Sequence, residues 1–366
     1  MARPVRVGIV GLGFGAEFIP IYQAHPEAEL VAICRRDRDA LQATGREFGV
    51  ARLYDRYEDM LQDADIDAVH INSPIPLHAK QAVDALNAGK HAACTVPMAT
   101  SLEDIQHIVG AANASGRTYM MMETVVYSRE FLYVSDLYRS GEMGRLQYVK
   151  GAHHQEMAGW PGYWEGLPPM YYATHAVSPC LCLPRAKAGS VCCLGSGRIS
   201  PQLAAHYGSP YAVETAVIKL VDSDVVASVT RSLFETAREY IESFDAYGQK
   251  LSFESPQTAV QKPLLYRGEV AEEVDVPDFA DRLPQTVRRF TTSSIYDGAE
   301  THRSFVQGSG HGGSHPHLVH EFVRAVADGR QAAIGPATAA NWTAVGICAH
   351  ESAIRGGAWV DVPAFE

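Results

Sequence analysis

The chain has 366 residues, of which 46% are hydrophobic and 20% charged, and its formal net charge is −11 at pH 7. This length and composition are typical of a globular protein with two domains. The acidic charge argues against a nucleic-acid partner, which would favour a basic surface, and no cluster of lysine and arginine indicates a membrane-binding patch. The sequence shows no apolar leader and no apolar run of bilayer length, so we expect a cytoplasmic protein.

The first predicted strand, residues 5–10, leads into a glycine-rich turn and a helix. Its spacing, Gly11-x-Gly13-x-x-Ala16, is that of a dinucleotide-binding loop. Gly11 permits the tight turn, Gly13 lets the backbone approach a pyrophosphate, and the small Ala16 lets the helix lie on the strand. The helix N-terminus then favours phosphate groups. We therefore predict a dinucleotide site here, to which the loop residues Phe14 and Gly15 also belong.

The second predicted strand, residues 29–37, would normally end in an acid that holds the ribose hydroxyls of NAD. This sequence has Cys34-Arg35-Arg36 instead. An arginine at this place could bind a 2′-phosphate or stack on adenine, or both arginines could be solvated loop residues. We expect NAD as the cofactor, and NADP is not excluded.

Further strands end near Asn72, within residues 91–99 and within residues 118–126, and helices alternate with them. One helix has a capping box at Ser101 and a glycine stop at Gly116. Five strands with crossover helices predict an α/β Rossmann domain, a doubly wound parallel sheet over residues 1–125. Because ligands bind at the carboxyl ends of such strands, the predicted cofactor crevice includes Asn72, Ser73, Pro74, His78, Thr95, Val96 and Pro97, with Glu123 at its rim.

The pattern changes near residue 126. A helix over residues 129–144 is followed by a strand at 146–157, and residues 212–234 and 240–255 alternate as antiparallel strands do. A late helix covers residues 338–357. Residues 126–366 are therefore expected to form a C-terminal α+β domain with an open, mostly antiparallel sheet. The free face of that sheet predicts a homodimer or homotetramer.

Two groups of residues raise the question of a metal. The seven cysteines lie mostly in apolar runs, and Cys180, Cys182, Cys192 and Cys193 lack zinc-site spacing, so reduced and buried thiols are expected. The glycine-rich run that contains His311, His315 and His317 is predicted to be a loop near the active site. No metal site is predicted.

The motifs "VGIVGLGFGAEF", "SPIPLHAKQAVDALNAGKH", "PMATSLEDI" and "AANWTAVGICAHESAIRGG" resemble the Gfo/Idh/MocA oxidoreductases, in the same order over nearly the whole chain. The resemblance implies a Rossmann domain, an oligomer-forming sheet, a nicotinamide cofactor and a sugar-like alcohol substrate. The sequence departs from the family twice. The family's Glu-Lys-Pro is Thr95-Val96-Pro97, without the lysine that helps move the alcohol proton. The aspartates that flank the family's histidine are replaced by Tyr171 and Ser178 around His175.

Both departures resemble the NAD-dependent glycosidases, namely the family 109 glycoside hydrolases and the NAD-dependent sulfoquinovosidases. The segments "TVPMATSLED", "MMMETVVYSRE" and "YYATHAVSP" carry this resemblance. In family 109 a valine replaces the lysine, and a Tyr-x-Thr-His motif matches Tyr172, Thr174 and His175. A glutamate, here Glu123, precedes a Tyr-x-Arg-Glu run that contains Tyr127 and Arg129. The resemblance implies small glycoside substrates, with sulfoquinovosides as one candidate.

Such an enzyme would oxidise carbon 3 of the sugar, eliminate the aglycone, add water and reduce carbon 3 again, so tyrosine and histidine could replace the usual carboxylate pair. His175 would take or orient the carbon-3 hydroxyl proton, and Tyr172 would serve carbon 2 or the leaving group. Glu123 would activate water or bind hydroxyls, and Tyr240 is a second candidate phenol. The predicted substrate-binding residues are Tyr127, Arg129, His153, His154 and Thr174, joined for an anionic sugar by Arg238, His302 and Arg303.

Two alternatives stay open. A sugar 3-dehydrogenase would release the keto product and NADH, and a nucleotide-binding protein without turnover would do neither.

Overall fold

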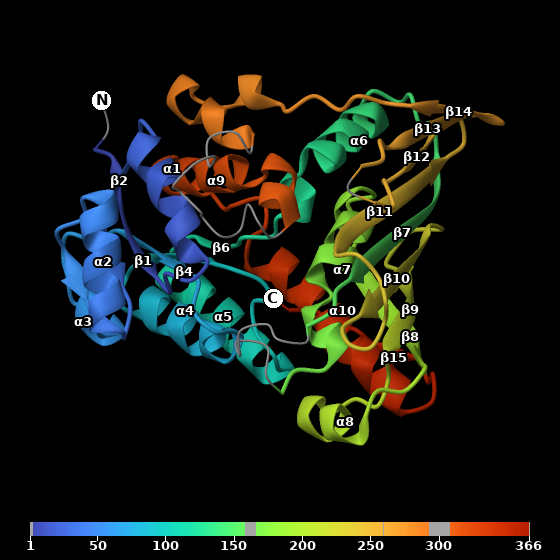
Figure 1. Cartoon of the computed structure of the whole chain (residues 1–366), viewed down its shortest axis with the longest axis horizontal. Coiled ribbons are helices and arrows are strands. Elements are labelled where there is room, and N and C mark those ends of the chain that lie inside the picture. Colours follow the sequence, from blue (N-terminus) through green and yellow to red (C-terminus); the bar gives the residue numbers. More distant parts are fainter. Residues whose placement is uncertain (1–2, 158–165, 259, 293–307, 366) are drawn as a thin grey trace. The chain divides into compact units, whose positions relative to one another are not determined.

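The computed structural model describes residues 3–157, 166–258, 260–292 and 308–365. The chain divides into two compact units, each with its own sheet (Figure 1). The first unit comprises residues 1–124, 278–340 and 365–366, and the second comprises residues 125–277 and 341–364. The sequence patterns predicted a single domain boundary near residue 125. The first unit's N-terminal segment ends there, at residue 124, and residues 278–340 also pack with the first unit.

The first unit contains a six-stranded sheet in the order β3-β2-β1-β4-β5-β6, and every neighbouring pair is parallel. Its strands are β1 (Val5–Val10), β2 (Ala28–Cys34), β3 (Leu53–Tyr54), β4 (Ala68–Ile71), β5 (His91–Cys94) and β6 (Tyr119–Met121). The predicted parallel doubly wound sheet is confirmed, with β3 as an addition. This strand has two residues, too few to show an alternation of hydrophobic residues in the sequence.

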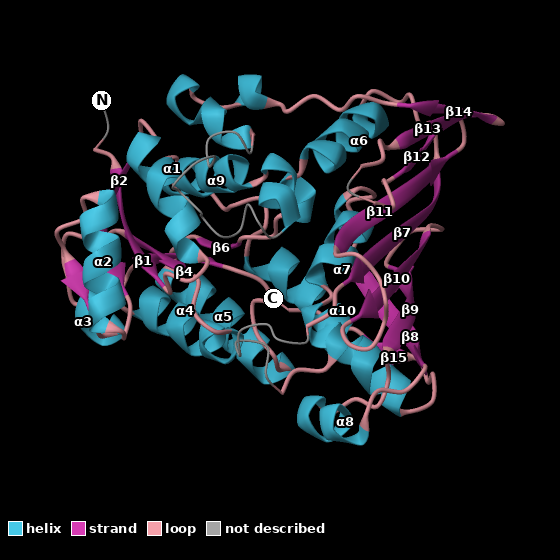
Figure 2. Cartoon of the chain, in the orientation of Figure 1, coloured by secondary structure: helices cyan, strands magenta, loops and turns pink. Residues whose placement is uncertain are grey.

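Helices connect these strands (Figure 2). They are η1 (Gly15–Phe18), α1 (Ile19–Ala24), α2 (Arg38–Phe48), α3 (Tyr57–Leu61), η2 (Ile75–Leu77), α4 (His78–Asn87) and α5 (Leu102–Ser115). Helix α5 has the predicted ends. The Ser101 side chain accepts a hydrogen bond from the Asp104 backbone N–H at 3.1 Å, and Gly116 follows the helix with a φ of 63°. Glycine adopts this left-handed conformation at little cost, which explains the stop.

Residues 278–340 add η6 (Ala280–Arg282), η7 (Gln285–Thr291), η9 (Gly308–Gly313) and α9 (His315–Ala327) to the first unit. The run around His311 was predicted to be a loop, and this prediction was wrong for its second half, since His315 begins α9. Pro316 lies in the first turn, where a proline is tolerated, and Leu318 and Phe322 follow at helical spacing and are buried.

Several imidazole side chains of the first unit are buried. His25 and His70 are 2% and 0% exposed, and His317 is 7% exposed. Burial lowers the pKa of His70 to about 3 and the pKa values of His25 and His317 to about 4. These side chains are therefore neutral at pH 7.

The second unit contains a nine-stranded sheet in the order β14-β13-β12-β11-β7-β10-β9-β8-β15. Its strands are β7 (Leu146–His154), β8 (Ala188–Ser196), β9 (Val213–Leu220), β10 (Val226–Ser232), β11 (Ile241–Gly248), β12 (Ser252–Glu254), β13 (Leu264–Arg267), β14 (Val270–Glu273) and β15 (Val360–Asp361). Strands β7 and β10 pair in parallel, and the other neighbours pair antiparallel. The mostly antiparallel sheet is therefore confirmed.

The helices of the second unit are η3 (Val125–Tyr127), α6 (Arg129–Arg139), η5 (Pro169–Tyr172), α7 (Thr174–Cys182) and α8 (Pro201–Tyr207), together with α10 (Pro336–Ile354) from Asn341 onward. Strand β7 passes very close to α7. A Cβ added at Gly151 would lie 2.8 Å from the Ala176 carbonyl carbon and would overlap its oxygen. Because only glycine fits there, the position of α7 on the sheet is closely determined.

All seven cysteines are free, and five of them are buried. Among the described residues, no group of three or more histidine, cysteine or acidic side chains could hold a metal ion. None of the described helices is long and apolar enough to cross a membrane.

Candidate functional site

The glycine loop joins the carboxyl ends of three strands in the first unit. Gly11 has a φ of 85°, and its N–H donates to the Cys34 carbonyl oxygen at 3.1 Å. A Cβ on Gly11 would lie 2.6 Å from the Ser73 nitrogen and would overlap the Asn72 backbone. Around Gly13, by contrast, an added Cβ would meet nothing within 4 Å. The loop can therefore be approached closely at Gly13, as a pyrophosphate requires.

The other loop residues serve packing. Ala16 is buried, and a Cβ on Gly15 would come within 3.0 Å of the Asn72 side chain. The half-buried Phe14 contacts Phe18 edge-on, with ring centroids 5.4 Å apart. The predicted helix start is the 3-10 helix η1, which continues into α1.

The buried His78 side chain contacts both loops that follow β4 and β5. Its Nδ1 lies 2.7 Å from the Pro97 carbonyl oxygen, and its Nε2 lies 2.8 Å from the Ser73 carbonyl oxygen. Burial lowers the pKa of His78, although the two carbonyl oxygens act in the opposite direction. The Thr95 hydroxyl donates to the Ile71 carbonyl oxygen at 3.2 Å. His78 thus links the two loops through Ser73 and Pro97. These loops contain the predicted rim residues Asn72, Ser73, Pro74, Thr95, Val96 and Pro97.

The rim offers polar groups to a nucleotide. The Asn72 Oδ1 is buried and has no hydrogen-bond partner among the described residues, so it could accept a hydrogen bond from a ribose hydroxyl. After β2, Arg35 is half-buried and Arg36 is exposed, while the Asp37 side chain caps α2 by accepting from the Ala40 N–H at 3.0 Å. Glu123 follows β6 at the same edge and is fully buried. These residues fit a dinucleotide.

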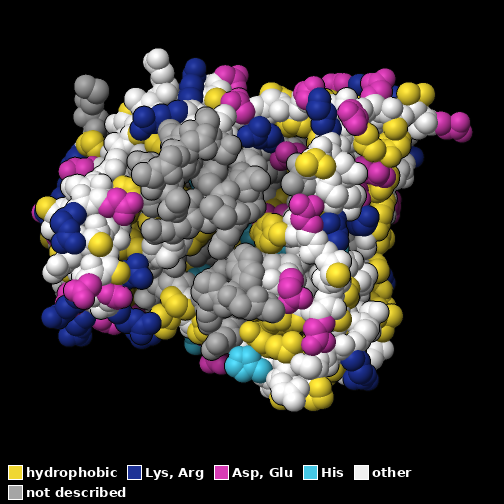
Figure 3. All heavy atoms as spheres, viewed as in Figure 1, with side chains coloured by type: hydrophobic (Ala, Val, Ile, Leu, Met, Phe, Trp, Pro, Cys, Tyr) yellow, Lys and Arg dark blue, Asp and Glu magenta, His cyan; other side chains and the backbone are white. Residues whose placement is uncertain are grey.

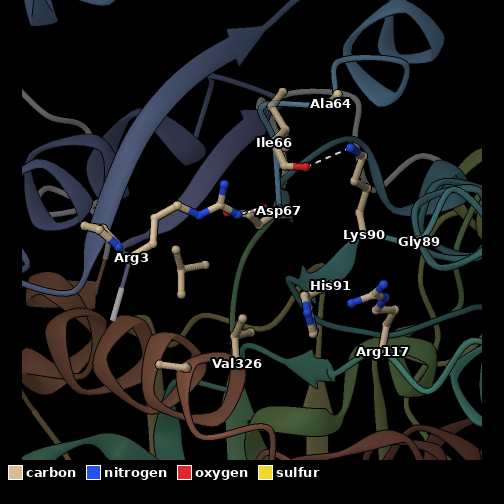
Figure 4. Close-up of a pocket in the computed structure, with 12 residues that line it drawn as sticks. Arg3, Ala64, Ile66, Asp67, Gly89, Lys90, His91, Arg117 and Val326 are labelled. Carbon is tan, nitrogen blue, oxygen red and sulfur yellow. Dashed lines mark hydrogen bonds and ion pairs between the residues drawn. The ribbon is translucent and has the colours of Figure 1, made fainter. Parts of the chain in front are cut away.

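A separate pocket of about 440 Å³ lies at the amino ends of β1, β4 and β5. It is lined by Arg3, Asp67, Lys90, His91 and Arg117 among others (Figure 4). The Lys90 ammonium group donates to the carbonyl oxygens of Asp63 and Ile66, each at 2.7 Å. Since nucleotides bind at the carboxyl ends of parallel strands, this pocket is distinct from the glycine loop.

In the second unit, phenol and imidazole groups gather on one face of the sheet. Tyr172 ends η5, His175 lies in the first turn of α7, and Tyr240 immediately precedes β11. The His175 Nε2 lies 3.2 Å from the Tyr172 hydroxyl. His175 is 2% exposed. The predicted catalytic residues Tyr172 and His175, from one stretch of chain, are thus brought together with Tyr240.

His153 occupies the centre of this cluster. Its ring centroid lies 5.2 Å from that of His175, 5.5 Å from that of Tyr240 and 6.0 Å from that of Tyr172. On β7 it is fully buried, and its cross-strand neighbours are Glu242 on β11 and Arg231 on β10.

Glu242 brings a carboxylate that the sequence analysis missed. Its Oε1 lies 3.5 Å from the His175 Nε2 and accepts a hydrogen bond from the Tyr240 hydroxyl. Burial raises the pKa of Tyr240 well above its usual value, and the charge and hydrogen bond of Glu242 raise it further. Glu242 lies on the same face of β11 as the buried Phe244 and Ala246, and this two-residue spacing could have indicated its inward position.

Arg231 is a second missed residue, and it is fully buried. Its guanidinium group donates to the carbonyl oxygens of Tyr172 at 3.2 Å and His153 at 3.1 Å, and to the Gln155 side chain at 2.9 Å. Burial lowers the pKa of Arg231 to about 10, so it stays charged at pH 7. Arg231 lies on the same face of β10 as the buried Ala227 and Val229, and this two-residue spacing could have indicated its burial.

Other predicted residues lie apart from these contacts. His154 interacts with Ser232 at 2.8 Å, as expected for the residue after His153 on the opposite face. The Tyr171 ring packs on His350, with centroids 5.6 Å apart. Arg238 donates to the Gln257 carbonyl oxygen. Thr174 is buried at the start of α7, Tyr127 and Arg129 are partly exposed in η3 and α6, and His302 and Arg303 lie outside the described residues.

Comparison with a known protein family supports the Rossmann fold of the first unit. Residues 5–123 match the sequence model of the Gfo/Idh/MocA family, described as an oxidoreductase family with an NAD-binding Rossmann fold. An uncharacterized oxidoreductase of Rhizobium meliloti is 32% identical over 149 residues, 40% of this chain and 45% of that protein. Glycosyl hydrolase family 109 protein 2 of Shewanella sp. (strain ANA-3) is 34% identical over 163 residues, 42% of this chain and 36% of that protein. The match thus spans less than half the length of these relatives.

Solved structures share the fold over the whole chain. An oxidoreductase from Agrobacterium radiobacter, solved with NAD⁺, L-tartaric acid and magnesium, has a TM-score of 0.78 at 16% identity and covers 98% of both chains. A levoglucosan dehydrogenase, solved with NADH and levoglucosan, has a TM-score of 0.77 at 19% identity and covers 99% of this chain and 100% of its own. At these identities the likeness shows the fold alone.

Proposed function

Since residues 5–123 match the sequence model of the Gfo/Idh/MocA oxidoreductases, with their NAD-binding Rossmann fold, we propose that the chain cleaves small glycosides by transient oxidation of the sugar at carbon 3. The observation that carries this proposal is the cluster of the buried His175 with the half-buried Tyr172 and Tyr240 around His153. It supplies proton carriers, whereas the β5 loop has Val96 where a dehydrogenase of this family would have lysine. The family 109 relatives support the choice of a glycosidase. Sulfoquinovosides are one candidate substrate class.

In the proposed reaction, the side chains of the protein mainly transfer protons. NAD⁺ held at the glycine loop would accept the carbon-3 hydride and later return it. With carbon 3 as a ketone, the carbon-2 hydrogen becomes acidic, and a base removes it while the bond from carbon 1 to the aglycone oxygen breaks. A proton goes to the aglycone, which leaves as an alcohol. Water then adds its hydroxyl to carbon 1 and a proton to carbon 2, so the net reaction is hydrolysis.

The residues divide these tasks. His175 takes or orients the proton of the carbon-3 hydroxyl, Tyr172 acts at carbon 2, and Tyr240 is the second phenol. Glu123, in the first unit, activates water or binds sugar hydroxyls. His153 and Thr174, with Tyr127 and Arg129, are proposed to bind the sugar, while His154 is a weaker candidate because it is engaged with Ser232.

The test is a screen of glycosides, including sulfoquinovosides, with the purified NAD-loaded protein and no added cofactor. We expect cleavage without net NADH, deuterium at carbon 2 of the product in heavy water, and slower cleavage of substrate deuterated at carbon 3. Tyr172→Phe should abolish cleavage yet keep bound NAD, while Tyr171→Phe, whose ring packs on His350, should stay active. Cleavage that persists in nicotinamide-free protein and shows no isotope effect would refute the proposal.

A sugar 3-dehydrogenase is the second candidate, because the solved relatives that share the fold include dehydrogenases. It predicts NADH that accumulates in proportion to a keto sugar, with no aglycone released. The same assay therefore separates the two functions.

Exposed hydrophobic side chains on the sheet of the second unit support a homo-oligomer. Strand β9 alternates buried Ala216 and Ile218 with Val217, which is 40% exposed, and Leu194 on β8 is 60% exposed. Hydrophobic side chains, yellow in Figure 3, are visible along the right-hand margin, where Figure 1 places the strands of this sheet. We propose that a second copy covers this face, and a mass in solution above 39.8 kDa is expected by light scattering.

A further inference from the structure

We infer that Glu242 is a positioning residue, which keeps a proton on the Nε2 of His175 and thereby makes Tyr172 the base and Tyr240 the proton donor of the cluster. The inference deepens the proposed function and rests on it for the identity of the reaction. The arrangement of the side chains stands independently of the substrate.

The first step concerns the His175 ring. Its Nε2 faces two oxygen atoms, the Tyr172 hydroxyl at 3.2 Å and the Glu242 Oε1 at 3.5 Å. An ionised carboxylate can only accept hydrogen bonds, so the attraction between Glu242 and Nε2 favours the tautomer with a proton on Nε2. Helix α7 contains no acidic residue of its own. The carboxylate that orients His175 therefore comes from strand β11.

The second step concerns Tyr172. A proton on the His175 Nε2 can be donated to the Tyr172 oxygen, which stabilises the phenolate more than the phenol. The buried guanidinium of Arg231 adds positive charge, since it lies 5.9 Å from the centre of the Tyr172 ring and donates to the Tyr172 carbonyl oxygen. Both neighbours favour the ionised form that a base at carbon 2 needs.

The third step concerns Tyr240. Its hydroxyl donates to the Glu242 Oε1, and burial and Glu242 together raise the pKa of Tyr240 well above its usual value. Tyr240 therefore keeps its proton, whereas the Tyr172 hydroxyl faces the His175 Nε2 and the Tyr172 ring lies near the Arg231 guanidinium group. Two like groups in environments that favour opposite protonation states are suited to act as base and acid. The same carboxylate produces both effects because it lies between Tyr240 and His175.

The experiment compares wild type with Glu242→Gln, which removes the charge and keeps the size, and Glu242→Asp, which keeps the charge. The matched control is Glu254→Gln. Glu254 also accepts hydrogen bonds from tyrosines of this sheet, Tyr247 at 2.7 Å and Tyr266 at 3.2 Å. Among the described residues, it makes no hydrogen bond to the cluster. The readouts are the nitrogen chemical shifts of the His175 ring in the NAD-loaded protein, assigned with a His175→Gln variant, and the pH profile of kcat.

We expect the Nε2–H tautomer in wild type. In Glu242→Gln the midpoint of the His175 titration should fall by about one pH unit, and kcat should fall by about 10²- to 10⁴-fold. Glu242→Asp should restore the midpoint, and Glu254→Gln should change neither readout. An Nδ1–H tautomer in wild type, or an unchanged midpoint in Glu242→Gln, would overturn the inference. If wild type cleaves no glycoside but the midpoint shifts as expected, the proposed function fails and the role of Glu242 stands.

Discussion

Gly11 and Gly13 lie in the same loop, yet a methyl group would act on folding at Gly11 and on cofactor binding at Gly13. At Gly11 it would strain a φ of 85° and overlap the backbone of Asn72, so Gly11→Ala should lower the free energy of unfolding by at least about 2 kcal/mol. At Gly13 it would meet no protein atom within 4 Å. Gly13→Ala should therefore leave the free energy of unfolding within about 0.5 kcal/mol and weaken NAD binding by at least about tenfold.

Urea unfolding and calorimetric titration with NAD measure the two effects separately. Equal unfolding free energies for the two variants would contradict the distinction. Undiminished NAD affinity in Gly13→Ala would remove the loop from the cofactor site.

Individual residues show which parts of the candidate site could be predicted from the sequence. Tyr172 and His175 are near neighbours in one motif, so a local pattern was enough to find them. Glu242 and Arg231 join the cluster only because the strand register places both beside His153. Register depends on pairing across the whole sheet, and a local pattern therefore reveals which face such a residue occupies but not which residue it meets.

Among the elements, the contact of β7 with α7 controls the placement of His175. A methyl group at Gly151 would overlap the Ala176 carbonyl oxygen in the middle of that contact. Gly151→Ala should therefore push α7 away from the sheet, lower the free energy of unfolding by about 2–4 kcal/mol and reduce the proposed glycoside cleavage. The control is Gly110→Ala on α5, where an added Cβ meets nothing within 4 Å and alanine should raise helix stability by about 0.5–1 kcal/mol.

Chemical denaturation and activity assays of both variants check this prediction. If Gly151→Ala is as stable and active as wild type, the contact does not position the helix.

Helices and strands whose start, buried face and end are all visible in their own sequence were predicted correctly. Segments without such a pattern were not. Helix α5 has a serine cap, an apolar face and a glycine stop within its own sequence, so its ends were predicted correctly. The "YYATHAVSP" segment gave no such signal, because its prolines and aromatic residues are compatible with several conformations. It forms η5 and the start of α7, which Gly151 and the sheet hold from outside the segment.

At the scale of the molecule, residues 278–340 belong to the first unit although the second unit separates them from residues 1–124. Helix α9 carries an ordinary amphipathic pattern, which indicates that one face is buried but not against which partner. Strand and helix types could therefore be predicted from local periodicity, whereas the return of the chain to an earlier unit depends on long-range packing.

The buried imidazoles of the first unit make the protein sensitive to acid. Unfolded histidines bind protons near pH 6.5, while His70, His25 and His317 have folded pKa values of about 3 to 4. Between these limits the unfolded chain binds more protons, so acidification costs up to about 1.4 kcal/mol per pH unit for each such side chain. The stability that is complete above pH 6.5 should therefore decline steadily towards pH 4.

Urea midpoints measured from pH 7 to pH 4.5 should follow this decline, and a His70→Gln variant should show a shallower slope. A slope unchanged by that substitution would exclude His70 as a contributor. Acid charges the interior of the first unit, so an acidified compartment or culture medium should deplete the folded protein.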